Sequence, residues 1–370
     1  MRAPSATAPD MSCAVRKFLS IFNYWHQVTR VGYAFCQASK TGVSTVGWYW
    51  RGGVPCMLEL FAFVARHGRY ALACGLLAGF LLPDIAQMLR PFLPQMILFL
   101  LFLTAFRIGA KATLEGLRNS LGALKVALIF QLVLPLMALA VFIPLGLSDT
   151  TFAIVIVLML AAPSVTATPN ITLLLGHDPE PAFRLLIVGT AILPLTIIPI
   201  FWLSSGLGHL ADAVAAAIKL LVAIWCVVLL SFALRRVTFP TLNTRYSDAL
   251  DGFTSLVLAI VVIGLMSAVG PALQTSPLVV LQWVLVAVVA NMGLQLVAFL
   301  ILRKLGWGTV AVPFAVVAGN RNFALFLIAL PEATTDPLLI FLGCYQVPMY
   351  LTALVMRRIF NAPHSSGRIN

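Results

Sequence analysis

The chain has 370 residues, of which 61% are hydrophobic and only 10% are charged, and its mean hydropathy is +1.00. This composition excludes a soluble globular protein and predicts an all-α polytopic membrane protein surrounded by a lipid bilayer. The net charge of +12 would suit nucleic acid in a soluble chain, but the basic residues lie mostly at the ends of apolar runs, so we interpret them as topology signals and expect no nucleic-acid partner.

The first 56 residues differ from the rest of the chain. They carry six Lys and Arg against the single acid Asp10 and lack an apolar run of the roughly 20 residues that a spanning helix needs. We expect residues 1–56 to form a basic cytoplasmic tail without a fixed fold, or to reflect a start assigned too early, with Met57 as the working start. A surface-binding amphipathic segment is the alternative. Residues 361–370 are predicted to form a short C-terminal tail after a membrane domain at 57–360.

Apolar segments separated by short loops predict ten transmembrane helices. A split after the fifth helix gives two repeats, 69–205 and 210–357. Because five is odd, the second repeat enters the membrane with the opposite polarity, which predicts an inverted repeat. The ten predicted spans are 69–87, 92–109, 122–146, 152–175, 182–205, 210–234, 249–270, 276–302, 309–331 and 336–357.

Loop charges support this count, because cytoplasmic loops of membrane proteins collect Lys and Arg. With the N-terminus inside, nearly all Lys and Arg of the loops fall on the cytoplasmic side, and only Arg90 and Lys219 fall outside. We therefore expect a multi-pass protein of the inner (plasma) membrane with both termini in the cytoplasm. The predicted outer side holds the acids Asp84, Asp149, Asp212, Glu332 and Asp336.

Two of the predicted spans contain polar interruptions. Arg321 lies at the centre of the ninth span, where the cost of inserting an arginine is about 2.5–3.5 kcal/mol. The fourth span carries the segment ATPNITLL, which aligns with GNRNFALF of the ninth at a constant offset. Interrupted helices at corresponding places in two halves are typical of transporters with a substrate site at the bilayer midplane. We expect the two broken helices to cross and to direct half-helix N-termini toward Arg321, which would make an anion site.

Polar residues at the two breaks are the main candidates for binding substrate or ions. Charges inside a membrane are functional by default. The alternatives are that Arg321 reaches an interface or pairs with a buried carboxylate, and that the fourth-span residues form an ordinary proline kink. Lesser candidates in the third and eighth spans have hydrogen bonding to a neighbouring helix as the equal alternative. The candidates are Arg321, Asn320, Asn322, Gly319, Thr168, Pro169, Asn170, Thr166, Ser164, Gln131, Asn291 and Gln295.

The sequence predicts neither an enzyme nor an ATP-driven pump. It contains no HExxH, GxSxG or Walker sequence, and its six cysteines form no CxxC pair. We therefore expect no cofactor and a transport process driven by a gradient or by none. Asp178, Pro179, Glu180 and Arg184 are interpreted as the start of the fifth helix.

The ten-span layout, the segment APSVTATPNITLLLGHD from Ala162 to Asp178 and the segment GNRNFAL from Gly319 to Leu325 resemble the bile acid:sodium symporter family, including its bacterial members. The resemblance covers about residues 65 to 360. It implies a panel domain of spans 1, 2, 6 and 7 and a core domain of the other six, with substrate moving as the core shifts against the panel. It also implies two sodium sites behind the crossing helices.

This sequence departs from the sodium-coupled members at the positions of their sodium ligands. The Glu and Gln that supply ligands in the ninth span correspond to Val317 and Arg321, and the hydroxyl ligands of the fifth span correspond to Ala182 and Leu186. The fourth-span Ser-Asn pair corresponds to Thr168-Pro169, and Gln131 stays as a third-span counterpart. Our hypothesis is that Arg321 stands where a sodium ion would lie, as a tethered cation that holds the crossing together or faces the substrate.

The leading prediction is a secondary transporter of a small organic anion, working by alternating access as a uniporter or linked to protons. Ordinary sodium symport through ligands that leave no sequence pattern is the alternative within this class. A membrane sensor or receptor that kept the fold is the alternative from another class. Sterol-like, keto-acid and pantothenate-type anions all suit an arginine-lined cavity, and the sequence does not choose among them or fix the oligomeric state.

Overall fold

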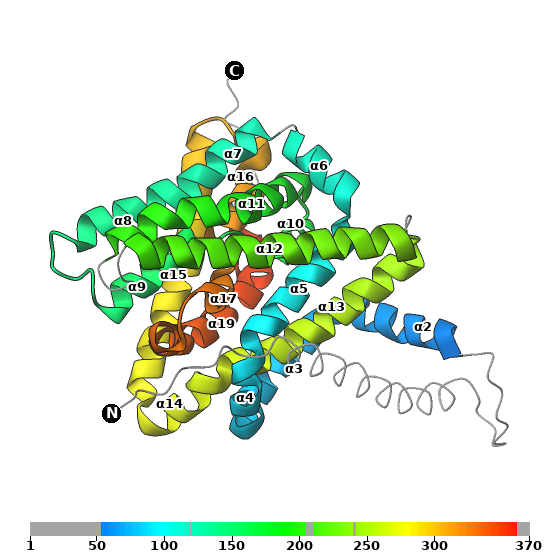
Figure 1. Ribbon diagram of the computed structural model, residues 1–370, viewed down its shortest axis with the longest axis horizontal. Helices are drawn as coiled ribbons and strands as arrows, with labels where there is room; N and C mark the ends of the chain where they lie inside the picture. The colour runs from blue at the N-terminus through cyan, green and yellow to red at the C-terminus, as the bar shows by residue number, and fades with distance from the viewer. Residues whose placement is uncertain (1–52, 119, 205–209, 240–241, 361–370) are drawn as a thin grey trace, which may run out of the picture.

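The computed structural model describes residues 53–118, 120–204, 210–239 and 242–360 (Figure 1). Within these ranges the chain is helical, with one isolated β-bridge. The predicted tails therefore lie outside the described residues, except for 53–56. Seven helices are long and apolar enough to cross a membrane, which makes the protein a helical multi-pass membrane protein: Pro83–Ile108, Leu121–Phe142, Glu180–Leu203, Leu210–Thr238, Thr244–Thr275, Pro277–Lys304 and Asp336–Val355.

Three further apolar helices are shorter, and they match the first, fourth and ninth predicted spans: Tyr70–Leu81, Thr151–Ala161 and Gly308–Gly319. Each of the ten apolar helices thus lies where a span was predicted. The number of membrane crossings and the inverted repeat go beyond this observation.

The beginning of the described chain differs from the prediction. Helix α2 starts at Gly53, inside the predicted tail, and the boundary between the first two spans lies at Leu82 and not at 88–91. Leu82 has φ −122° and ψ 66°, because the residue before a proline is pushed out of the helical region, and Pro83 then begins a new helix. The elements are α2 (Gly53–Arg66), α3 (Gly68–Leu81), α4 (Pro83–Leu89), η1 (Arg90–Phe92) and α5 (Leu93–Ile108).

The middle of the chain contains the third to fifth predicted spans. Thr150 caps α9 by accepting a hydrogen bond from the backbone N–H of Ala153 at 3.2 Å. A π-helical turn, η2, lies within the third span. The elements are α6 (Ala110–Arg118), α7 (Leu121–Leu128), η2 (Ile129–Val133), α8 (Leu134–Phe142), α9 (Thr151–Ala161), α10 (Thr168–Leu174) and α11 (Glu180–Leu203).

The second half of the chain begins with three long helical segments and ends in shorter pieces. The elements are α12 (Leu210–Thr238), α13 (Thr244–Leu265), η4 (Met266–Ala268), α14 (Val269–Thr275), α15 (Pro277–Lys304), α16 (Gly308–Gly319), η5 (Phe323–Leu325), α17 (Phe326–Ala329), α18 (Glu332–Thr335), η6 (Asp336–Leu338), α19 (Leu339–Val355) and α20 (Arg357–Phe360).

The helices pack in two groups. In the first helix group, α13 lies against α2, α3, α4 and α5, and α12 lies against α5 and also borders α11. Figure 1 shows α13 running beside α5. In the second helix group, α15 packs against α16 and α19, α11 packs against α7, α10 and α16, and α8 packs against α9. We use "first group" for α2–α5 with α12–α14 and "second group" for α7–α11 with α15–α20.

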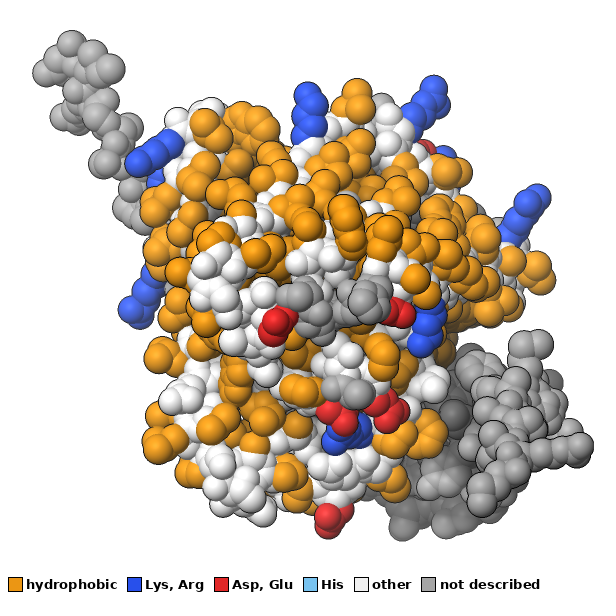
Figure 2. All heavy atoms as spheres, turned by 60° about the vertical axis from the view of Figure 1, so that its left-hand side comes forward, with side chains coloured by type: hydrophobic (Ala, Val, Ile, Leu, Met, Phe, Trp, Pro, Cys, Tyr) orange, Lys and Arg blue, Asp and Glu red, His pale blue; other side chains and the backbone are white. Residues whose placement is uncertain are grey.

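Large apolar side chains cover much of the outside of the molecule. Leu121, Val237 and Leu354 are 77%, 82% and 74% exposed. In Figure 2, apolar side chains spread over the visible face, Lys and Arg project mostly from its upper and side margins, and Asp and Glu gather in its centre and lower half. Apolar surface on this scale needs a lipid environment rather than water.

Candidate functional site

The fourth and ninth predicted spans are both interrupted, and the two interruptions touch. Helix α9 ends at Ala161 and α10 begins at Thr168, while α16 ends at Gly319 and the helical chain resumes at Phe323. Between these ends, Ser164 and Arg321 form an isolated antiparallel bridge. The N–H of Val165 donates to the carbonyl of Asn320 at 3.0 Å, and the N–H of Asn322 donates to the carbonyl of Pro163 at 2.7 Å. Each break thus satisfies backbone groups of the other, as non-helical backbone at membrane depth requires.

Arg321 is buried at this crossing, with 2% of its surface exposed. Its Nε donates to the carbonyl oxygen of Ala318 at 2.8 Å, and its Nη1 donates to that of Ala162 at 3.1 Å. The guanidinium carbon lies 5.0 Å from the ring centre of Phe130, within the range of a cation–π interaction. Nη2 has no hydrogen-bond partner among the described residues. The guanidinium is therefore held by two carbonyls and an aromatic ring.

The two carbonyls are those of helix C-termini. Ala162 is the C-cap of α9, and Ala318 lies in the last turn of α16. The last carbonyls of a helix lack partners within the helix and carry the negative end of its dipole, so both ends attract a cation. The sequence led us to expect half-helix N-termini at the guanidinium, and the structure places C-termini there. The half-helices that follow the breaks are short, seven residues in α10 and four in α17.

A cavity of about 70 Å³ lies beside the crossing, between the two helix groups. Arg321 is the single charged residue among those that line it, and Tyr350 contributes a buried hydroxyl without a hydrogen-bond partner in the described part of the chain. The cavity is smaller than the roughly 300–1,000 Å³ of ligand pockets, so the site is closed in this conformation. The lining residues are Ile97, Leu100, Leu101, Leu258, Val261 and Leu265 from the first group, and Val165, Thr166, Ala167, Arg321, Asn322, Ala324, Leu342, Gln346, Met349 and Tyr350 from the second.

The predicted residues of the fourth span separate into three environments. Thr166 lines the cavity, and Asn322 of the ninth span lies across from it in the same lining. Ser164 and Thr168 are buried and bond to each other, with the Ser164 hydroxyl donating to Thr168 Oγ1 at 2.7 Å. Pro169 is half-buried, and Asn170 is exposed on α10. Asn170 therefore does not join the cavity with Thr166 and Asn322.

The predicted residues of the eighth span belong to an amide network, which we define as Asn291, Gln295, Asn320 and Thr352. Asn291 Nδ2 donates to the carbonyl of Gly319 at 2.6 Å and to Asn320 Oδ1 at 3.3 Å. Gln295 Nε2 donates to Asn291 Oδ1 at 2.7 Å and to Thr352 Oγ1 at 3.1 Å. All four side chains are fully buried, and none lines the cavity. The network joins the end of α16 to α15 and α19. These contacts fit the alternative that Asn291 and Gln295 hydrogen-bond to a neighbouring helix.

Gln131 lies on the other side of the crossing, in the π-helical turn η2. It is 2% exposed, its Oε1 has no partner among the described residues, and its Nε2 fills the space that a side chain at Gly189 of α11 would need. Gln131 therefore neighbours Phe130, which stacks on Arg321, but does not line the cavity.

Of the positions that the resemblance matches with sodium ligands, those in the fifth and ninth spans carry no side-chain oxygen, whereas Thr168 and Gln131 do. Val317, Ala182 and Leu186 are 3%, 0% and 5% exposed and lie in α16 and α11. Sodium prefers several hard oxygen ligands. The carbonyls of Ala162 and Ala318 are oxygens of this kind, and both already accept from the guanidinium.

Several residues at the crossing escaped sequence reasoning. The Tyr345 hydroxyl donates to the carbonyl of Gly319 and accepts from the N–H of Arg321 at 3.4 Å. Phe130, Gln346, Tyr350 and Thr352 also belong to the crossing, the cavity or the amide network. Each lies in an otherwise apolar span, where a single aromatic, amide or hydroxyl looks like ordinary helix packing. The signal in α19 was that Tyr345, Met349 and Thr352 follow one another at four- and three-residue spacing, with Gln346 beside them, which brings three polar side chains close to one face of the helix.

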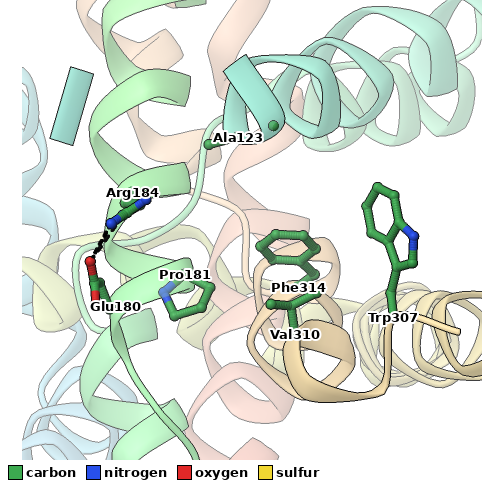
Figure 3. A pocket seen from close by; sticks show the side chains of 8 residues that line it. Ala123, Glu180, Pro181, Arg184, Trp307, Val310 and Phe314 are labelled. Carbon is green, nitrogen blue, oxygen red and sulfur yellow. Dashed lines mark hydrogen bonds and ion pairs between the residues drawn. The ribbon is translucent and has the colours of Figure 1, made fainter. Parts of the chain in front are cut away.

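A second, wider pocket of about 410 Å³ lies elsewhere, where α7, α11 and α16 begin (Figure 3). Arg184 Nε donates to Glu180 Oε1 at 3.1 Å within it, and Trp307 and Phe314 extend from the α16 side. The predicted helix start is present here, because Asp178 Oδ1 accepts from the N–H of Glu180 at 3.0 Å and α11 begins at Glu180. The ion pair leaves no net charge among the lining residues, and the crossing contributes none of them.

Neither a scan against protein-family models nor a search of curated proteins finds a match to this chain, so the likeness to bile acid:sodium symporters stays a prediction from the residues.

Proposed function

We propose that this protein is a secondary transporter of a small organic anion, which works by alternating access and uses Arg321 as a built-in cation. The observation that carries the proposal is the position of Arg321, buried where two broken helices cross and lining a cavity between two helix groups. Broken helices that meet in the middle of the membrane are where secondary transporters hold substrates and coupling ions.

The environment of the guanidinium suits a group that takes the place of a bound cation. It rests between the carbonyl ends of α9 and α16, where a free cation would otherwise neutralise two helix dipoles. Because the charge is covalently attached, it is present in every step of a transport cycle and does not depend on the concentration of an external ion. The proposal therefore includes loss of sodium dependence.

The cavity favours an anion with an apolar part. Arg321 supplies the only charge among the lining residues. Thr166, Asn322, Gln346 and Tyr350 supply polar groups, and apolar side chains supply the rest of the wall. Burying an anion in such a site is costly unless a cation compensates it, and a carboxylate or sulfonate meets that requirement. The substrate class we propose is a small carboxylate or a bile-acid-like anion.

The helix arrangement supports a ten-crossing topology with an inverted repeat. The broken spans at 151–174 and 308–329 become long enough to cross a bilayer when their two halves are taken together. The two helix groups coincide with the panel and core domains that the resemblance implies, and the interruptions occupy corresponding places in the two halves. We propose an inner-membrane location with both termini in the cytoplasm.

Uptake into proteoliposomes tests the function. The purified protein should accumulate labelled carboxylates or steroid sulfonates above protein-free liposomes, and Arg321→Gln should abolish this uptake while inserting normally. A reference variant in the wider pocket, Trp307→Ala, should keep it, since the pocket in Figure 3 shares no residue with the crossing. Uptake equal to that of empty liposomes for every anion tried, by a folded protein, would favour a sensor or receptor.

A further inference from the structure

Several contacts between the two helix groups lie in the same half of the membrane in the proposed topology. The groups meet most extensively along α11 and α12, and further through α13, η4 and α14 against α19, through α14 against α15, and through α17 against α5 and α12. By the proposed topology, η4, α14 and α17 all lie in the outer half of the membrane. In contrast, α10, in the inner half, packs against α11, α16 and α19 of its own group.

The outer contact is close-packed at one glycine. A Cβ at Gly343 of α19 would lie only 2.9 Å from the carbonyl oxygen of Leu265, which ends α13. Leu265 also lines the cavity. The absence of a side chain at Gly343 therefore lets the two helix groups close directly above the cavity on its outer side.

An ion pair joins the groups at the same outer end. Arg90 in η1 of the first group pairs with Asp336 in η6 of the second, and their side chains are 32% and 46% exposed. Other described pairs stay within one group: Arg107 with Asp251, Arg245 with Glu59, and Arg184 with Glu180. The Arg90–Asp336 pair is thus placed where relative movement of the groups would break it.

We infer that the Arg90–Asp336 pair is an outer latch, which holds the two helix groups together on the outer side of the cavity and must open when the cavity opens to the outside. The inference rests on the proposed function for its direction, because the outer side is set by the proposed topology. The interaction energy of an exposed ion pair suits this task, since such pairs typically change a two-state equilibrium by up to about fivefold. The latch therefore favours the closed state over the open state but still allows the groups to separate.

Labelling of the cavity from outside tests the latch without any transport substrate. Leu258 lines the cavity from α13, so Leu258→Cys, in a variant whose six native cysteines are replaced, reports the access of a membrane-impermeant maleimide to whole cells. Arg90→Ala or Asp336→Ala should raise the labelling rate about two- to fivefold, as expected for loss of an exposed ion pair. The double exchange Arg90→Asp with Asp336→Arg should return it toward the original rate.

The matched control is Asp251→Ala, which breaks an ion pair within the first group and should leave the labelling rate unchanged. Equal labelling in all these variants would overturn the latch, as would an Arg90→Ala effect that the double exchange fails to reverse. Labelling that follows the prediction in a protein without uptake would keep the latch and reject the transport proposal. Uptake by a protein whose labelling rate does not change in Arg90→Ala would reject the latch and keep the transport proposal.

Discussion

The cluster at Arg321 and the amide network lie on neighbouring parts of the same crossing, yet they are built differently. Both consist of buried polar groups at membrane depth. The first carries a full charge, leaves Nη2 without a partner among the described residues and borders the cavity. The second is neutral, makes hydrogen bonds chiefly within itself, and joins α15, the end of α16 and α19.

This difference shows what separates a candidate site from a structural network in a membrane protein. Polar residues inside a membrane are costly in both cases, and in both they find partners. The network uses most of its hydrogen-bonding groups to hold helices in place, and its one unpartnered atom among the described residues, Gln295 Oε1, lies away from the cavity. The guanidinium has an unpartnered Nη2 and belongs to a residue that lines the cavity. Variants of the two regions should therefore affect different quantities.

The largest effect is expected for Arg321→Gln. The change removes the charge-assisted hydrogen bonds to Ala162 and Ala318, and one such bond contributes roughly 1.5–3 kcal/mol. Uptake should fall at least about tenfold, since about 1.4 kcal/mol corresponds to a factor of ten. Arg321→Lys, which keeps the charge but lacks the planar fork, should retain part of the activity. Equal uptake by wild type and Arg321→Gln would show that the arginine only fills space.

A change in the amide network should act on stability. Asn291→Leu removes the donor to the carbonyl of Gly319 and the bridge that Asn291 forms between Gln295 and Asn320, which should cost about 1–3 kcal/mol as lost buried hydrogen bonds. Thermal unfolding in detergent should shift to lower temperature. The KM for uptake should stay within about twofold, because the variant makes no contact with the cavity. A large rise in KM at unchanged stability would place Asn291 in the substrate site instead.

Removal of the Tyr350 hydroxyl should give a moderate and purely local effect. The hydroxyl is buried beside the cavity without a hydrogen-bond partner in the described chain, so we expect it to donate to bound substrate. Tyr350→Phe should raise KM about three- to tenfold, the range for one hydrogen bond, while the unfolding temperature stays the same or rises. Tyr246→Phe, on an exposed tyrosine of α13, is the control. An unchanged KM would exclude the hydroxyl from substrate binding.

The smallest effect is expected for Asn170→Ala. Asn170 is exposed on α10 and outside the cavity lining, and exposed substitutions usually change stability by less than about 0.5 kcal/mol. Kinetics of uptake and unfolding temperature should both match wild type. Loss of transport in this variant would mean that the crossing rearranges and brings Asn170 into the substrate path.

The sequence predicted the positions of the apolar helices and of both breaks, because length, hydropathy and helix-breaking residues are local properties. Pro163, Pro169 and Gly319 marked the interruptions at the residues where α9 and α16 end and α10 begins. The boundary was placed too late, because residues 88–91 with Arg90 looked like the loop, although Pro83 already begins the next helix. The start of α2 at Gly53 was missed, because residues 53–56 follow directly on a segment rich in Lys and Arg and were assigned to the tail.

The arrangement around Arg321 needed the three-dimensional structure. The sequence identified Arg321 but not its partners, since the Ala162 and Ala318 carbonyls belong to the backbone and leave no residue pattern. Whether C- or N-terminal half-helix ends meet the guanidinium depends on how two helices cross. Asn291 and Gln295 looked like site residues because they share a helix face, and only their contacts with Thr352 and Gly319 show that they form a network.

The central claim is that Arg321 does the work of a coupling cation, and uptake with and without a sodium gradient tests it most directly. Wild-type protein in proteoliposomes should take up the labelled anion at rates that agree within about twofold when sodium outside is replaced by choline, because the tethered charge is already in place. Strong stimulation of wild-type uptake by an inward sodium gradient would contradict the account, since a mobile ion would then still be required beside the fixed guanidinium.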